Sequence, residues 1–142
     1  MGIEIGIVRI NRKIMISERS AVSALVTDWS RIRKDNPAPG IQRQMVVGEN
    51  VMMVRFTFEP FLVTPEHTHP HEQMTLVVQG KVKFFIEGEV KIVSPGDVLH
   101  FPPNNRHGAT MLDEEVVLID IFSPIREDFL EQPSSNGNSA SK

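Results

Sequence analysis

The chain concentrates potential metal-binding side chains in one short segment, His67-Thr68-His69-Pro70-His71-Glu72-Gln73. In an extended backbone, side chains two residues apart point to the same side, about 7 Å apart along the strand. The imidazoles of His67 and His69 can therefore converge on one metal ion, and Gln73 has the same parity and offers an amide oxygen. A histidine cluster beside prolines can also be a solvated loop, so this segment alone leaves both interpretations open.

A second element supplies His107 as a further candidate ligand. The residues Ser94-Pro95-Gly96-Asp97 predict a turn, and the following run from Val98 to Phe101 predicts a short strand. A hairpin after that strand would return His107 to the other histidines. The chain has no cysteine, so imidazole, carboxylate or amide groups must carry any metal, and Mn, Fe, Co, Ni and Zn all suit three imidazoles and one oxygen.

His71 and Arg55 are weaker candidates for the site than these ligands. His71 has the parity to join the other two histidines, but Pro70 redirects the chain between them. We therefore expect His71 to support the ligands or to contact a substrate. Arg55 could face the same cavity from an earlier strand and clamp a substrate carboxylate, or it could make an ordinary exposed contact.

Asp120 interrupts an apolar run near the end of the chain, Glu115 to Phe122. An unpaired carboxylate is costly to bury, so such a residue is usually paired or lies in a wet functional cavity. If its strand face points inward, Asp120 and Phe122 line the cavity, and the aspartate becomes a candidate acid or base. The alternative is a structural ion pair, for which the candidate partners are Arg126, Arg55 and Arg43.

Residues 40 to 122 contain the elements that must position these side chains. Short runs of strand-forming residues alternate there with turn residues: QMVV, NVMMVRFTF, MTLVVQ, KVKFFI, VKIV, DVLHF and EVVLIDIF. No helical segment fits between them, which predicts an all-β fold, a small antiparallel barrel or sandwich. Runs such as MTLVV are apolar on both faces, so the N-terminal segment or, more simply, the second subunit of a homodimer must cover the outer face.

The flanking residues divide the chain into three parts. Residues 1–39 are expected to form an N-terminal extension, with an edge strand over residues 1–16 and one short amphipathic helix from Ala21 to Ile32. Prolines at the end of this extension stop the helix, and residues 40–130 form the main domain. Residues 131–142 have no apolar side chain larger than alanine, which predicts a disordered tail.

The composition narrows the class of protein. The 142 residues are enough for one compact domain, and a net charge of -3 provides no basic surface for nucleic acid. No apolar run is long enough for a signal peptide or a membrane span, and the absence of cysteine fits the cytoplasm. We therefore expect a cytoplasmic protein with no nucleic-acid or membrane partner.

The spacing of these motifs resembles the cupin superfamily. His-x-His is followed by three residues, Gln, six residues and Gly80, and a later Pro95-Gly96-Asp97 turn has His107 eleven residues after its glycine. Gly80 and the Pro-Gly pair occupy turn positions. This resemblance implies a jelly-roll β-barrel with a metal inside it.

The resemblance implies that His67, His69 and His107 are metal ligands. Gln73 stands where most metal-binding cupins have glutamate. A neutral amide leaves the site one charge unit more positive, which strengthens a divalent metal as a Lewis acid and favours an anionic ligand.

Within the cupins, the segments HTHPHEQ, PGD and D-I-F-S-P-x-R-E-D-F-L resemble the pectin-degradation (KdgF-type) subgroup over residues 40–130. Members of this subgroup open the ring of 4,5-unsaturated uronate monosaccharides to linear keto-uronates, an isomerisation that uses no oxygen. The resemblance implies that Asp120, Phe122 and Arg126 are catalytic. As a hypothesis, Asp120 moves protons, Arg126 holds the small anionic sugar, and Phe122 packs against it and excludes water.

Two other functions stay open. Many cupins with a three-histidine iron site are dioxygenases, although Gln73 in place of glutamate argues against this activity. A non-catalytic cupin that binds a sugar or an anion is the alternative from another class of protein.

Overall fold

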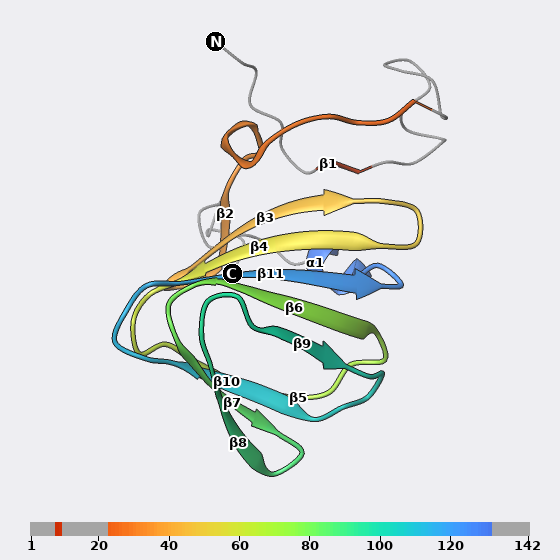
Figure 1. Ribbon diagram of the computed structural model, residues 1–142. Coiled ribbons are helices and arrows are strands. Elements are labelled where there is room, and N and C mark those ends of the chain that lie inside the picture. The colour runs from red at the N-terminus through yellow and green to blue at the C-terminus, as the bar shows by residue number, and fades with distance from the viewer. Residues whose placement is uncertain (1–7, 10–22, 132–142) are drawn as a thin grey trace, which may run out of the picture.

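The chain folds into two facing β-sheets in the computed structural model, which describes residues 8–9 and 23–131 (Figure 1). The larger sheet contains, in spatial order, β1 (Val8–Arg9), β3 (Ile41–Val47), β4 (Met52–Phe58), β11 (Val116–Ser123), β6 (Glu72–Gln79) and β9 (Val98–Phe101), with β2 (Asp35–Ala38) paired to β3. The smaller sheet contains β5 (Val63–His67), β10 (His107–Met111), β7 (Val82–Ile86) and β8 (Glu89–Val93). The predicted all-β jelly roll is confirmed, as a sandwich of two sheets rather than a closed barrel.

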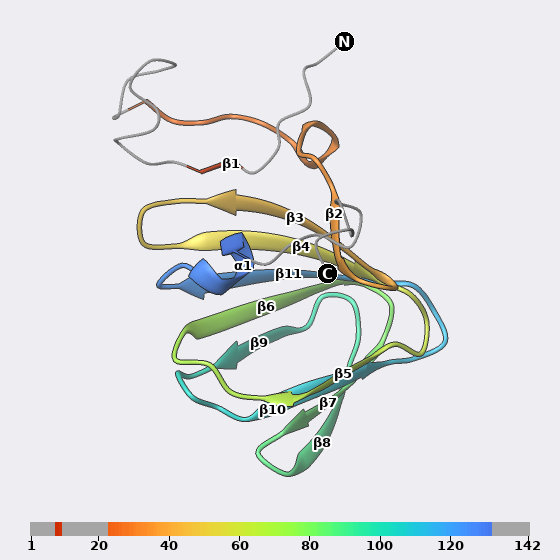
Figure 2. The ribbon, with the colours of Figure 1, turned by 180° about the vertical axis from the view of Figure 1, so that it is seen from behind.

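Strands that are distant in the sequence lie side by side in both sheets. β11 runs between β4 and β6, and β10 runs between β5 and β7, each antiparallel to its two neighbours (Figure 2). Gly80 and Gly96 have φ values of 78° and 95°, so they occupy the turns that their positions predict. The pairing of β10 with β5 brings His67, at the end of β5, directly opposite His107, at the start of β10.

The core follows from the alternation of side chains along each strand. An aliphatic and aromatic cluster fills the space between the two sheets; its members are Phe58, Val77, Val82, Phe84, Val93, Phe101, Ala109, Met111, Val116 and Leu118. A second cluster lies at the other end of the larger sheet and contains Met45, Val47, Met52, Val54, Phe122 and Ile125. The short helix α1 (Glu127–Glu131) packs Phe129 and Leu130 against this second cluster.

The predicted N-terminal helix is wrong for the part that the structure describes. Residues 23–28 are irregular, and only the single 3-10 turn η1 (Trp29–Arg31) follows, capped by the side chain of Asp28. Gln44 on β3 explains this, because its amide donates to the carbonyl oxygens of Trp29 and Ile32 and so binds the segment to the outer face of the sheet. Ile32 is buried while Val26 is 89% exposed, so helical spacing does not gather these side chains on one face.

The other predictions for the ends of the chain are tested only in part. Val8 and Arg9 pair in parallel with Val46 and Val47 at the edge of the larger sheet. The rest of the predicted edge strand, the start of the predicted helix and residues 132–142 lie outside the described residues. β2 also pairs with β3, so the sheet includes residues 35–38, before the expected boundary at residue 40. No helix in the described part of the chain is long and apolar enough to cross a membrane.

Candidate metal centre

Three histidines converge between the two sheets. His67, His69 and His107 each offer one ring nitrogen, and these three atoms lie within 4.8 Å of one another. His67 and His107 are opposite each other on β5 and β10, and His69 lies in the connection from β5 to β6. The structure therefore brings together the three imidazoles that the sequence identified as ligands.

The backbone fixes which ring nitrogen each imidazole presents. The Nδ1 atoms of His67, His69 and His107 lie 2.9, 3.1 and 3.0 Å from the carbonyl oxygens of Pro65, His71 and Asn105. A carbonyl oxygen only accepts, so each Nδ1 carries the proton and donates it. In a neutral imidazole held in this way Nε2 has the lone pair, which is the state that a metal requires.

Burial keeps two of these rings neutral. The pKa of His107 is lowered to about 4, mainly because burial disfavours its charged form and secondarily because His67 lies beside it. Burial also lowers the pKa of His69, with a further contribution from the charge of Arg126. Both imidazoles are therefore available as neutral ligands at pH 7.

Gln73 completes the donor set. Its Oε1 atom lies 3.0 Å from Nε2 of His69 and is buried. Because Nδ1 of His69 already donates to a carbonyl, Nε2 and Oε1 face each other with lone pairs, and a cation between them satisfies both. Three imidazoles and one amide oxygen thus fit a divalent ion, and the donor chemistry alone does not choose among Mn, Fe, Co, Ni and Zn.

Two residues that the sequence analysis did not identify hold His107 in place. A Cβ atom on Gly108 would lie 2.9 Å from the backbone nitrogen of Glu66 and from the backbone oxygen of Thr64, so only glycine lets β5 and β10 approach this closely. The pairing shifts register between His107 and Ala109. Phe101 stacks on the His107 ring with their centroids 4.3 Å apart.

A cavity of about 220 Å³ opens beside the donor atoms. Its polar lining includes His67, His107, Gln73, Asp120 and Arg126, and the rest of its lining is mainly aromatic and aliphatic. This volume is below the roughly 300–1,000 Å³ of pockets that hold drug-sized ligands, so it suits a small molecule.

Asp120 lines this cavity, which is the arrangement expected if its face of the strand points inward. It is 7% exposed, and one carboxylate oxygen accepts a hydrogen bond of 2.7 Å from the hydroxyl of Thr75. Burial raises the pKa of Asp120 to about 7, against the lowering effect of the Thr75 hydrogen bond and of Arg126.

The alternative of a structural ion pair for Asp120 is not observed. Arg43 makes hydrogen bonds of 3.1 and 2.7 Å to Asp35. Arg55 donates to Gln44. Arg126 binds Asp128, so each candidate partner is directed to another group.

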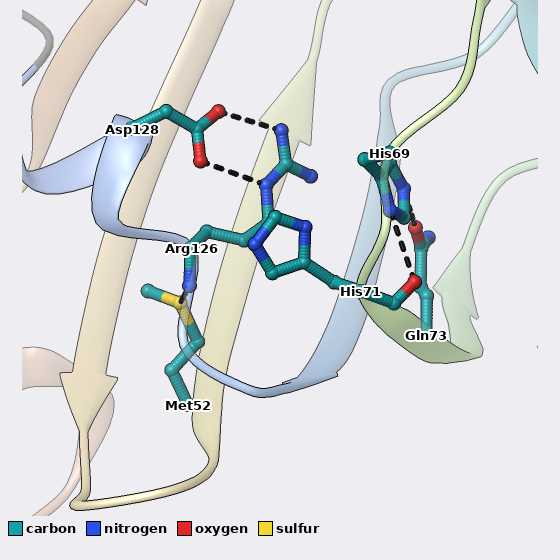
Figure 3. A network of polar contacts seen from close by, with 6 residues as sticks. All are labelled: Met52, His69, His71, Gln73, Arg126 and Asp128. Atoms are coloured by element: carbon teal, nitrogen blue, oxygen red, sulfur yellow. Dashed lines mark hydrogen bonds and ion pairs between the residues drawn. The ribbon is translucent and has the colours of Figure 1, made fainter. Parts of the chain in front are cut away.

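Arg126 borders the same cavity and is firmly held (Figure 3). Its Nε and Nη2 atoms donate to the two carboxylate oxygens of Asp128 at 3.0 and 2.8 Å, and this contact lowers the pKa of Asp128. The guanidinium also lies over the rings of Phe129 and Phe122, at 4.1 and 5.0 Å from their centroids. Its backbone nitrogen donates to the sulfur of Met52. The residue is therefore preorganised, with one edge of the guanidinium bound to Asp128.

His71 and Arg55 lie in different places relative to the site. The backbone oxygen of His71 accepts the hydrogen bond from His69, and burial lowers the pKa of the His71 ring, which lies near Arg126 and Asp128 (Figure 3). His71 thus supports a ligand and borders the arginine. Arg55 contacts Gln44 and is absent from the cavity lining, because the inward side chains of β4 are its neighbours at even positions. Of the two alternatives for Arg55, the structure shows a contact outside the cavity.

The chain matches known proteins over the region that contains this site. A model of the cupin domain family matches residues 54–122. The pectin degradation protein KdgF of Dickeya dadantii (strain 3937) is 39% identical over 106 residues, which are 73% of this chain and 92% of that protein.

Two solved structures resemble the whole sandwich. KdgF from Halomonas sp. has a TM-score of 0.71 at 34% identity, and the match covers 75% of this chain and 99% of that chain. An RmlC-like cupin from Shewanella frigidimarina NCIMB 400 has a TM-score of 0.70 at 31% identity, with 75% of this chain and 96% of that chain covered.

Proposed function

Because this chain belongs to the KdgF group of the cupin superfamily, we propose that it opens the ring of 4,5-unsaturated uronate monosaccharides to give linear keto-uronates. The observation that carries this proposal is the meeting of a metal-binding donor set with Asp120 and Arg126 in one small cavity. The cysteine-free composition favours the cytoplasm as the compartment of the reaction.

Four side chains would hold the cofactor, one divalent ion: His67, His69, Gln73 and His107. When bound, the ion would supply Lewis-acid polarisation of the substrate's oxygen atoms. The neutral amide of Gln73 leaves the full charge of the ion and the ligands at +2, which suits an anionic sugar.

Arg126 would bind the carboxylate of the substrate. Its Nε and Nη2 atoms are committed to Asp128, which leaves the other N–H groups of the guanidinium for the cavity. The aromatic rings of Phe122 and Phe129 hold its plane in position, so little conformational entropy is lost when the sugar binds. Phe122 would also pack against the sugar and exclude water.

Asp120 would move the protons. It accepts the proton of the anomeric hydroxyl, the anomeric carbon becomes an aldehyde, and the bond from that carbon to the ring oxygen breaks. The electron pair leaves on the ring oxygen as an enolate, and the alkene carbon then takes up a proton, which leaves a ketone. Atoms and electrons balance without an oxidant. A pKa of about 7 suits a group that must both accept and return a proton at neutral pH.

The test is to incubate the protein with one metal at a time and unsaturated galacturonate, and to follow the loss of ultraviolet absorbance of the conjugated alkene. We expect loss faster than the spontaneous reaction, and no acceleration from the double variant His67→Ala, His69→Ala. Absence of acceleration with Mn, Fe, Co, Ni and Zn would contradict the proposal.

Two measurements separate the alternatives. Oxygen uptake with the sugar would indicate a dioxygenase, because ring opening consumes none. Tight binding of the uronate with an unchanged product spectrum would indicate a non-catalytic sugar-binding cupin.

The outer face of the larger sheet supports a homodimer as the assembly. Its exposed apolar side chains are between 36% and 70% exposed: Met53, Met74, Leu76, Val78, Val98 and Ile121. Ile121 lies opposite both Met53 and Met74 across the strands, so the patch is continuous. A two-fold dimer places identical patches against each other. Light scattering should give twice the monomer mass, and Leu76→Glu should give monomers; a monomeric unchanged protein would contradict this.

A further inference from the structure

Three consecutive side-chain contacts run along the buried wall formed by β6 and β11. Nε2 of His69 lies 3.0 Å from Oε1 of Gln73, Nε2 of Gln73 donates to the hydroxyl of Thr75 at 2.9 Å, and this hydroxyl donates to Asp120 at 2.7 Å. The contacts thus join a candidate metal ligand to the candidate proton carrier.

The direction of these hydrogen bonds follows from the single proton of the Thr75 hydroxyl. Because that proton is donated to Asp120, the hydroxyl oxygen can only accept from its other neighbour. Of the two ends of the Gln73 amide, only the NH₂ group can donate, so this end faces Thr75. The amide oxygen is therefore turned toward His69.

We infer that Thr75 is a positioning residue, which orients the Gln73 amide for the metal and holds Asp120 with the same hydroxyl. The inference rests on the proposed metal ligation by Gln73. Thr75 itself contacts neither the metal-binding nitrogens nor the cavity, so it acts only through these two residues.

The fold gives Thr75 this position. Thr75 and Asp120 are directly paired across β6 and β11, and Gln73 precedes Thr75 by two residues on the same face of β6. Thr75 is 1% exposed, and Gln73 and Asp120 are also buried, so water does not compete for their hydrogen bonds.

This arrangement also accounts for an amide, rather than a carboxylate, at position 73. A glutamate there would turn an oxygen toward the Thr75 hydroxyl, whose one proton is already donated to Asp120. Two oxygen atoms would then face each other without a proton between them, which is costly in a buried site. The Thr75–Asp120 pair therefore favours glutamine.

The test measures Zn²⁺ binding by calorimetry, without sugar, for Thr75→Val and Thr75→Ser. Valine has the shape of threonine without the hydroxyl, and serine retains the hydroxyl. We expect Thr75→Val to weaken Zn²⁺ binding by about 10- to 100-fold, as for other residues that orient ligands, and Thr75→Ser to restore most of it. Equal affinities for the unchanged protein and Thr75→Val, or equal losses in the valine and serine variants, would overturn the inference.

A double-mutant cycle separates positioning from a general loss of structure. In the Gln73→Ala background, Thr75→Val should cost little further Zn²⁺ affinity, because the amide that it orients is gone. A full additional loss there would overturn the inference. Thr57→Val is the matched control, because Thr57 lies on the outer face of β4, away from the metal site. This variant should leave Zn²⁺ binding unchanged. If Thr75→Val does not fold, Thr75→Ala is measured in the same cycle.

These outcomes are distinct from failure of the proposed function. A protein that binds Zn²⁺ with the expected pattern but opens no uronate ring refutes the substrate and leaves the role of Thr75 standing. A protein that binds no divalent metal refutes both.

Discussion

The two walls of the site hold their functional groups in different ways. The histidine wall consists of His67, His69 and His107, and each of these imidazoles donates Nδ1–H to a backbone carbonyl. The relay wall consists of Gln73, Thr75 and Asp120, which are held by hydrogen bonds between side chains.

This difference determines how each wall can be altered. A backbone carbonyl does not titrate and survives every side-chain substitution, so the histidine wall changes only if a ligand is removed or the backbone moves. The relay wall can be rearranged by a single hydroxyl or carboxyl. It is also the wall that holds the group with a pKa near 7, which must change its protonation during a reaction.

The largest effect should follow from removing a ligand of the histidine wall. His107→Ala should lower metal affinity by about 100-fold or more and reduce ring opening to the spontaneous rate, because one of the few ligands is lost. Calorimetry and the absorbance assay measure the two effects. His100→Ala is the control, since this histidine is exposed on β9 and binds Glu72. Full activity in His107→Ala would show that this residue is not a ligand.

The next effect should come from the relay wall. Asp120→Asn should lower kcat by about 10²- to 10⁴-fold, the usual contribution of a general acid or base, while the protein still binds its metal. The amide oxygen of the introduced asparagine can still accept the hydrogen bond from Thr75, so the orientation of Gln73 is preserved. Single-turnover rates and metal content measure this; loss of the metal together with activity would indicate a structural role instead.

The same substitution should stabilise the metal-free protein at high pH. The folded pKa of about 7 exceeds the ordinary value of 3.8, so the folded state binds more protons between these values and loses stability as pH rises. Asp120→Asn removes this cost, by at most about 4 kcal/mol above pH 7. Urea unfolding at pH 8 and pH 4 measures the difference, which should nearly vanish at pH 4. An equal difference at both pH values would contradict the burial argument.

A substitution next to the ligands should displace the backbone that positions the histidine wall. Gly108→Ala should destabilise the protein by about 1–3 kcal/mol and weaken metal binding, because the new Cβ atom would meet the backbone of β5 at 2.9 Å. Thr110→Ala on the same strand is the comparison. Unchanged metal affinity in Gly108→Ala would show that the approach of β5 and β10 does not set the geometry of the ligands.

The smallest effect is expected on the stability of the folded protein at acid pH. The pKa values of His69 and His107 are lowered in the folded state, so their contribution to stability is present above pH 6.5 and is lost as pH falls toward about 4. Asp120 has the opposite trend throughout this window, so the measurement uses the Asp120→Asn background. Urea unfolding should show falling stability from pH 6.5 to 4, and His107→Gln should reduce the slope. A flat profile would contradict the pKa direction of the histidines.

Strand parity accounts for what the sequence could predict. Asp120 and Phe122 share the inward face of β11, because side chains alternate along a strand with a period of two residues. His67 and His69 also converge, although His69 lies just beyond the end of β5. The turn glycines supplied the boundaries of several strands. The all-β fold class and the candidates His67, His69 and Gln73 followed from these local rules. The complete ligand set, with His107, followed from the resemblance to the cupin superfamily.

Pairing between distant strands accounts for what the sequence could not predict. Thr75 gains its role only because β6 lies beside β11, and a threonine in a strand gives no other signal. Asp128 could have been noticed two residues after Arg126, but its contact depends on α1. The predicted helix failed because Gln44 binds Trp29 and Ile32 to the outer face of the sheet, with contacts that no local pattern reveals.

One face of β11 contributes side chains to both the hydrophobic core and the cavity. Val116 and Leu118 belong to the aliphatic cluster between the sheets, and Asp120 and Phe122, further along the same face, line the cavity. Anyone who randomises this strand to obtain new substrate specificity would lose many variants to misfolding before their activity could be selected.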